Sequence, residues 1–136
     1  MIKYMSTVEY KYVGISHDKL EKCLRWLQNS YQLRDWEIDL DTCFDIPKEF
    51  GDEHPDEVNA LINIHPDRLR ALVWIPLKRL KEQDENPCEA LCHELTHVLM
   101  SRCGISQEDE LAVRIISPVT YKAMCRELKI KLAGRK

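Results

Sequence analysis

The spacing of the apolar residues changes twice along the chain, and this limits the possible folds more than any other feature. Helical spacing predicts a helix over residues 17–31, and strict alternation then predicts a strand over 36–40. Two further apolar runs, 59–64 and 71–75, flank Pro66-Asp67 and predict a hairpin. Helical spacing returns after the second run. This order favours an α+β fold, with an N-terminal helix, a small, mostly antiparallel sheet of about three to four strands, and further helices after it.

The first helix after the sheet has the clearest boundaries. Asn86 is suited to cap its start and Gly104 to end it. We expect the next helix to begin after a cap at Ser106 and to stop at Pro118, because proline removes a backbone donor from a helix interior. A last helix is predicted over about 119–131.

Length, composition and charge exclude several classes of protein. A chain of 136 residues, 44% of them hydrophobic, fits a single domain spanning 1–136. No apolar run approaches the roughly 18–20 residues that cross a bilayer, and no signal-peptide core is present, so we expect a cytoplasmic protein without a membrane partner. With 20 basic and 23 acidic residues, no overall field favours nucleic acid. The six scattered cysteines are expected to be reduced.

Residues 93–97, with the sequence HELTH, form a complete HExxH motif inside the best-defined helix. Positions i and i+4 share one helical face, so His93 and His97 can both bind one Zn²⁺ at about 2.0–2.1 Å. Glu94 projects about 100° away from His93, beside the metal but off the ligand axis. From there its carboxylate can act as the general base toward a water on the metal. The motif therefore predicts metal-assisted hydrolysis.

A catalytic zinc needs a third protein ligand, and the motif alone does not supply it. The longer pattern HExxHxxGxxH fails, because Met100 and Cys103 stand at its last two defined positions. Cys103 ends the same helix and is expected on a different face. The following helix offers acids instead, with Glu108 and Glu110 as the two candidates.

Helical geometry favours Glu108 over Glu110. We take the inward face of this helix from its apolar residues, which include Leu111, Ile115 and Val119. Glu108 then lies about 30° from the centre of that face, whereas Glu110 lies almost opposite and faces solvent. A carboxylate on an apolar face is costly unless a partner such as a metal ion compensates it. Glu108 is the predicted third ligand and Glu110 the alternative.

These features resemble the gluzincins, and more closely their very small bacterial and phage members, the minigluzincins and the ImmA/IrrE-type metallopeptidases. The resemblance rests on HELTH at 93–97, on the acid-led stretch EDELAVRII at 108–116 and on the strands that precede them. It covers about residues 30–120, and HELTH is its most specific part. The ImmA/IrrE pattern usually has Asn four residues after the ligand glutamate, where this chain has Ala112.

The resemblance implies a zincin-like fold and a zinc-dependent peptidase that acts on a protein or peptide substrate. It further implies that an edge strand, here taken as 71–76, holds the substrate backbone by strand addition, and it suggests a phage or prophage setting. We expect a monomer or weak dimer. Tyr121 is a minor candidate for stabilising an oxyanion, and Cys103 for occupying the open metal position in a latent enzyme. Two alternatives remain open: a zinc-stabilised interaction module with little turnover, and an accidental motif.

Overall fold

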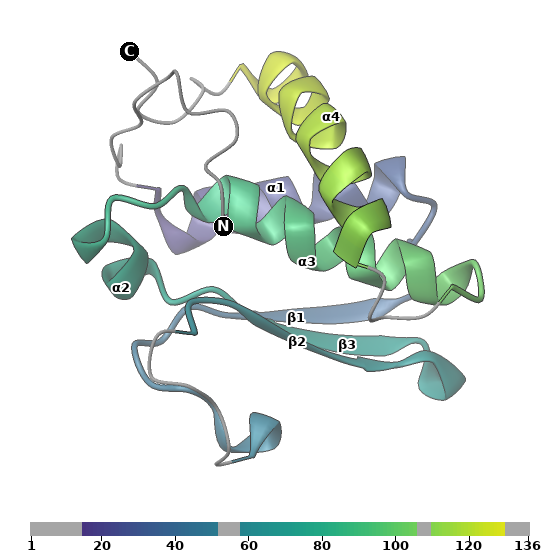
Figure 1. Ribbon diagram of the computed structural model, residues 1–136, viewed down its shortest axis with the longest axis horizontal. Coiled ribbons are helices and arrows are strands. Elements are labelled where there is room, and N and C mark those ends of the chain that lie inside the picture. Colours follow the sequence, from purple (N-terminus) through teal and green to yellow (C-terminus); the bar gives the residue numbers. More distant parts are fainter. Residues whose placement is uncertain (1–14, 52–57, 106–109, 130–136) are drawn as a thin grey trace.

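The computed structural model describes residues 15–51, 58–105 and 110–129 (Figure 1). Its elements, in chain order, are α1 (His17–Ser30), β1 (Glu37–Asp41), η1 (Lys48–Phe50), β2 (Leu61–His65), η2 (Pro66–Arg68), β3 (Arg70–Trp74), α2 (Leu77–Glu82), α3 (Pro87–Arg102) and α4 (Glu110–Leu128). The predicted α+β class is confirmed, and so are the first helix, the first strand and the hairpin that turns at Pro66-Asp67.

The strands of the described residues form one three-stranded sheet in the order β1-β3-β2. β2 pairs antiparallel with β3, as a hairpin must, but β1 pairs parallel with β3. The prediction of a mostly antiparallel sheet was therefore wrong. The alternation within β1 indicates which of its residues point to each side of the sheet, but it does not indicate which strand pairs with β1 or in which direction. The choice of 71–76 as an edge strand was also wrong, since β3 is paired on both sides and β1 and β2 are the edges of the described sheet.

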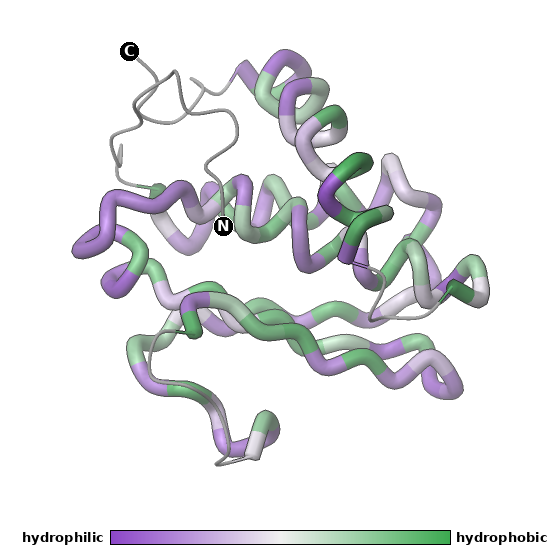
Figure 2. The backbone as a smooth tube through the Cα atoms, in the orientation of Figure 1, coloured by the Kyte–Doolittle hydropathy of each residue, from purple (hydrophilic) through white to green (hydrophobic). Residues whose placement is uncertain are grey.

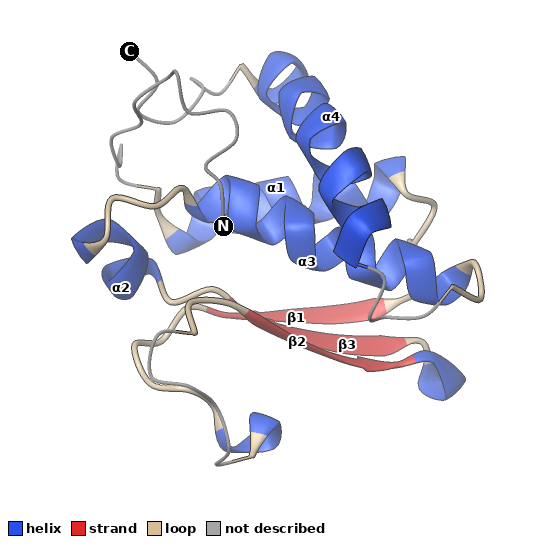
Figure 3. Ribbon diagram, in the orientation of Figure 1, coloured by secondary structure: helices blue, strands red, loops and turns tan. Residues whose placement is uncertain are grey.

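Polar and apolar residues alternate along β1 and in the middle of β2, whereas β3 is apolar after Arg70. Figure 2 shows the hydropathy along the strands, and successive residues of a strand point to opposite faces of the sheet. The register aligns Ile38, Ala71 and Ile64 in one row across the strands, and all three are buried. The next row places Glu37 beside Arg70, whose guanidinium pairs with that carboxylate at 3.3 Å. Helices α1, α3 and α4 all lie on one side of the sheet (Figure 3), so the apolar rows face them.

Helix α3 begins and ends where the sequence predicts. The Asn86 side chain accepts hydrogen bonds from the amides of Cys88 and Glu89, at 3.0 and 3.4 Å. Beyond the last turn, Gly104 has a φ of +77°, a conformation that glycine adopts without strain. Between these ends α3 packs against α1, α4, β2 and β3, and it is the most enclosed helix of the fold. Its fully buried apolar residues are Cys88, Leu91, Cys92, Leu95 and Val98.

Helix α2, which follows β3 directly, is not predicted from the sequence. It has only six residues, and no side chain caps its start at Pro76. A segment this short carries too little periodicity to distinguish it from a loop. Leu80 anchors it in the core.

Helix α4 runs without a break through Pro118, so the two separate helices predicted here are one. Its buried stripe is Val113, Ser117, Tyr121 and Met124, at helical spacing on both sides of the proline. Burial of this stripe outweighs the backbone hydrogen bond that proline removes. The apolar residues expected to face inward, Leu111, Ile115 and Val119, are 64–71% exposed instead. No helix among the described residues, α4 included, is both long and apolar enough to cross a membrane.

Two valines of α4 test this assignment of faces. Val113 is fully buried and Val119 is 69% exposed. We expect Val113→Ala to lower the free energy of unfolding by about 2 kcal/mol, because it removes buried methyl groups and leaves a cavity. Val119→Ala should change it by less than about 0.5 kcal/mol. Urea denaturation followed by circular dichroism measures both, and equal losses would contradict the orientation of α4.

Candidate metal centre

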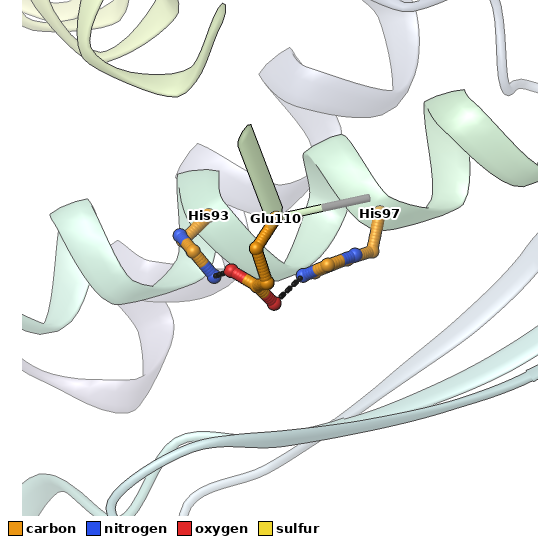
Figure 4. Close-up of side chains that lie close together, drawn as sticks. All are labelled: His93, His97 and Glu110. Atoms are coloured by element: carbon orange, nitrogen blue, oxygen red, sulfur yellow. Dashed lines mark ion pairs between the residues drawn. The ribbon is translucent and has the colours of Figure 1, made fainter. Parts of the chain in front are cut away.

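Three side chains converge where the start of α4 meets α3 (Figure 4). His93 and His97 come from successive turns of α3, and Glu110 is the first residue of α4. Glu110 places one carboxylate oxygen 3.3 Å from Nε2 of His93 and the other 2.9 Å from Nε2 of His97. The structure thus brings together the two motif histidines and a glutamate from the next helix.

The spacing of these atoms fits a shared metal ion. One ligand atom from each of His93, His97 and Glu110 lies within 4.8 Å of the others. Ligands about 2.0–2.2 Å from a tetrahedral Zn²⁺ are separated from one another by about 3.3 Å, close to the distances found here. Two imidazoles and one carboxylate also form a common donor set of catalytic zinc sites.

The protonation of the site also suits a cation. Burial, more than any other influence, lowers the pKa of His93 despite the nearby Glu110 carboxylate, and a neutral imidazole is the form that binds a metal. Burial of its carboxyl, together with the negative charge of Glu110, raises the pKa of Glu94 to about 8. Two carboxylates thus share a partly desolvated site, and a cation there would favour the ionised form of both.

The acid in the described cluster is Glu110, the alternative in the helical prediction, whereas Glu108, the predicted ligand, falls outside the described residues. Glu110 was expected to face solvent, and its side chain is indeed 48% exposed, but its carboxylate reaches both histidines of α3. The face of α4 was misjudged because the helix was expected to stop at Pro118. In a helix that stops at Pro118, Leu111 and Ile115 define the predicted inward face. In the continuous helix the inward face includes the buried Val113, and Glu110 lies three residues before it, about one turn away. Continuing the helical pattern through the proline would have identified Glu110.

The two minor candidates lie elsewhere in the described structure. Cys103 is exposed at the C-terminal cap of α3, and its thiol is not part of the described cluster. The hydroxyl of Tyr121 is buried against the N-terminal end of α3, where it accepts a hydrogen bond from the Asn86 side chain at 2.5 Å. That bond serves packing between α3 and α4.

The second ring nitrogen of His97 has an unusual environment. Its Nδ1 is buried and has no hydrogen-bond partner among the described residues. In histidines that bind a metal, the N–H of the second ring nitrogen generally donates a hydrogen bond to a carbonyl, a carboxylate or a water, and this fixes the orientation of the ring. The orientation of His97 therefore depends mainly on its packing, since its side chain is only 8% exposed.

Comparison with known proteins identifies no relative of this chain. No family model, no curated protein and no solved structure matches it.

The raised pKa of Glu94 predicts how the stability of the metal-free protein depends on pH. In the unfolded chain this carboxyl ionises near its ordinary pKa of about 4.3, whereas in the folded chain it stays protonated up to about 8. Its stabilising contribution is therefore lost as the pH rises through that interval. We expect the wild-type protein in EDTA to lose about 2 kcal/mol between pH 6 and pH 9 relative to Glu94→Gln. Urea denaturation curves that shift in parallel for both proteins would contradict this.

Proposed function

We propose that this protein is a zinc-dependent metallopeptidase with a zincin-like arrangement of its active-site helix and glutamate helix. The observation that carries the proposal is the convergence of His93, His97 and Glu110 beside Glu94. In this proposal the first three residues hold the metal and Glu94 is the general base. The resemblance of the motif at 93–97 to that of the gluzincins supports the same assignment.

Zinc suits the donor set, since two imidazoles and a carboxylate bind it with an open fourth position. When bound, the metal would acidify a water molecule and polarise the carbonyl of the scissile bond. The chain supplies the geometry through α3, whose packing orients both imidazoles. Glu110 adds a negative charge that partly offsets the charge of the cation.

Glu94 would carry the proton through the reaction. It would take a proton from the attacking water and later give it to the leaving amine. Ordinary carboxylates are weak bases at neutral pH, but desolvation raises the pKa of this one to about 8 in the metal-free protein. A bound cation would lower that value toward the range in which the group exchanges protons readily.

The substrate in this proposal is a protein or peptide segment in extended form. Helix α3 packs against β2 and β3, and β2 is the edge strand of that pair. An extended chain could therefore pair with β2, from Leu61 to His65, while its scissile bond faces the histidines of α3. In this proposal β2 takes the role expected for β3, whose backbone is already paired on both sides.

Metal content is the first test of the proposal. We expect the protein to bind about one zinc ion per chain and His97→Ala to lose it. Glu110→Gln should lower the zinc affinity, because the carboxylate of Glu110 contacts both imidazoles. Glu108→Gln, a matched change two residues earlier, should retain it. Mass spectrometry under native conditions and chelator competition measure these outcomes, and the reverse behaviour of the two glutamate variants would identify Glu108 as the ligand.

Catalysis needs a separate test, because a zinc-stabilised interaction module would share the metal site. We expect Glu94→Gln to keep zinc and to lower kcat by about 10²–10⁴-fold on a peptide cleaved by the wild-type protein. A peptide library followed by mass spectrometry measures cleavage. If the zinc-loaded wild-type protein cleaves no member of the library beyond the background of Glu94→Gln, the interaction module is the better description.

A further inference from the structure

The position of Glu110 depends on how α4 as a whole packs against α3. Glu110 begins α4, and the helix runs from it to Leu128. Helix α4 is continuous through Pro118, so contacts further along it help to fix the position of its first residue. The contacts between α4 and the rest of the fold therefore decide whether Glu110 reaches His93 and His97.

Tyr31 makes a polar connection between the two helices. It follows the last residue of α1, its side chain is buried, and its hydroxyl lies between α3 and α4. This hydroxyl hydrogen-bonds Thr96 Oγ1 of α3 at 2.9 Å and Thr120 Oγ1 of α4 at 2.8 Å. Burial raises the pKa of Tyr31, so the hydroxyl keeps its proton at neutral and mildly alkaline pH.

Thr96 links this connection to the motif itself. It directly precedes His97 and is fully buried, and its hydroxyl oxygen also lies 2.7 Å from the carbonyl oxygen of Cys92, one turn earlier. On the other side, Thr120 lies ten residues after Glu110, about 15 Å along the axis of α4. One phenol thus joins the turn of α3 that holds His97 to the middle of the helix that begins with Glu110.

We propose that Tyr31 is a positioning residue for the metal centre: by bonding both Thr96 and Thr120, its hydroxyl sets the register of α4 on α3 that brings Glu110 to His93 and His97. Apolar packing alone is weakly directional and permits small slides and rotations of one helix on another, whereas hydrogen bonds fix distance and angle. A second hydrogen bond, from the Asn86 side chain to the hydroxyl of Tyr121, lies one residue after Thr120 and also connects α4 to the start of α3. A shift of about 1 Å at a metal ligand or catalytic group is enough to weaken a site substantially.

The inference rests on the proposed metal site, and its test measures zinc affinity in folded protein. Tyr31→Phe removes the hydroxyl and keeps the ring, and Thr120→Val replaces a hydroxyl with a methyl group of similar size. We expect each to raise the zinc Kd by about tenfold, the lower end of the effect of residues that support metal ligands. Kd is measured by chelator competition at a temperature where circular dichroism shows wild-type secondary structure.

Matched variants separate positioning from a general loss of stability. Thr120→Ser keeps a hydroxyl at the same position and should retain the wild-type Kd. Ile38→Val trims a buried residue of the edge strand β1 and should lower the melting temperature without changing Kd. The double variant Tyr31→Phe/Thr120→Val should bind zinc about as well as either single variant, because each change breaks the same connection between α3 and α4.

The outcomes separate this inference from the function on which it rests. A wild-type protein that binds no zinc overturns both. Zinc binding by the wild type with an unchanged Kd in Tyr31→Phe and Thr120→Val overturns the inference alone. Equal weakening by Thr120→Ser and Thr120→Val also overturns it, because the hydroxyl would then not be the group that matters.

Discussion

The enclosure of α3 is the constraint on which the rest of this structure depends. Helix α3 packs against β2 and β3 and also contacts the helices α1 and α4, and Leu91, Leu95 and Val98 are fully buried along it. The same helix carries His93 and His97 on the face that meets the start of α4. Because core side chains are closely packed, the orientation of α3 cannot change without a large loss of stability. The two imidazoles are therefore held by the hydrophobic core itself.

The electrostatics of the site follow from its position at the margin of this core. Glu94 and Glu110 bring two carboxylates close to each other, and burial disfavours the charged form of Glu94. Such an arrangement is costly in a protein without a compensating cation, and the raised pKa of Glu94 expresses that cost. A divalent cation between the histidines and Glu110 would relieve it. The proposed function thus accounts for a cluster of charges that packing alone does not explain.

Much of the fold can be predicted from local patterns. The helix over His17–Ser30, the alternating strand Glu37–Asp41, the hairpin and both ends of α3 all agree with prediction, because capping and periodicity act within a few residues. The partners of the strands could not be predicted in this way. The parallel pairing of β1 with β3 joins residues 33 positions apart, such as Glu37 and Arg70, and no local pattern specifies it. For the same reason the edge of the sheet was misassigned.

The candidate site shows the same difference between what local patterns predict and what tertiary packing determines. By itself, the sequence determined that His93 and His97 share one face of a well-capped helix with Glu94 beside them, because an i, i+4 spacing is a local property of the helix. Only the tertiary structure shows that the carboxylate of Glu110 lies beside them. The burial of Val113, Tyr121 and Met124 against the core carries α4 through Pro118 and turns Glu110 toward α3. That placement depends on how α4 packs against α3 and α1, which overrides the helix-breaking tendency of a single proline.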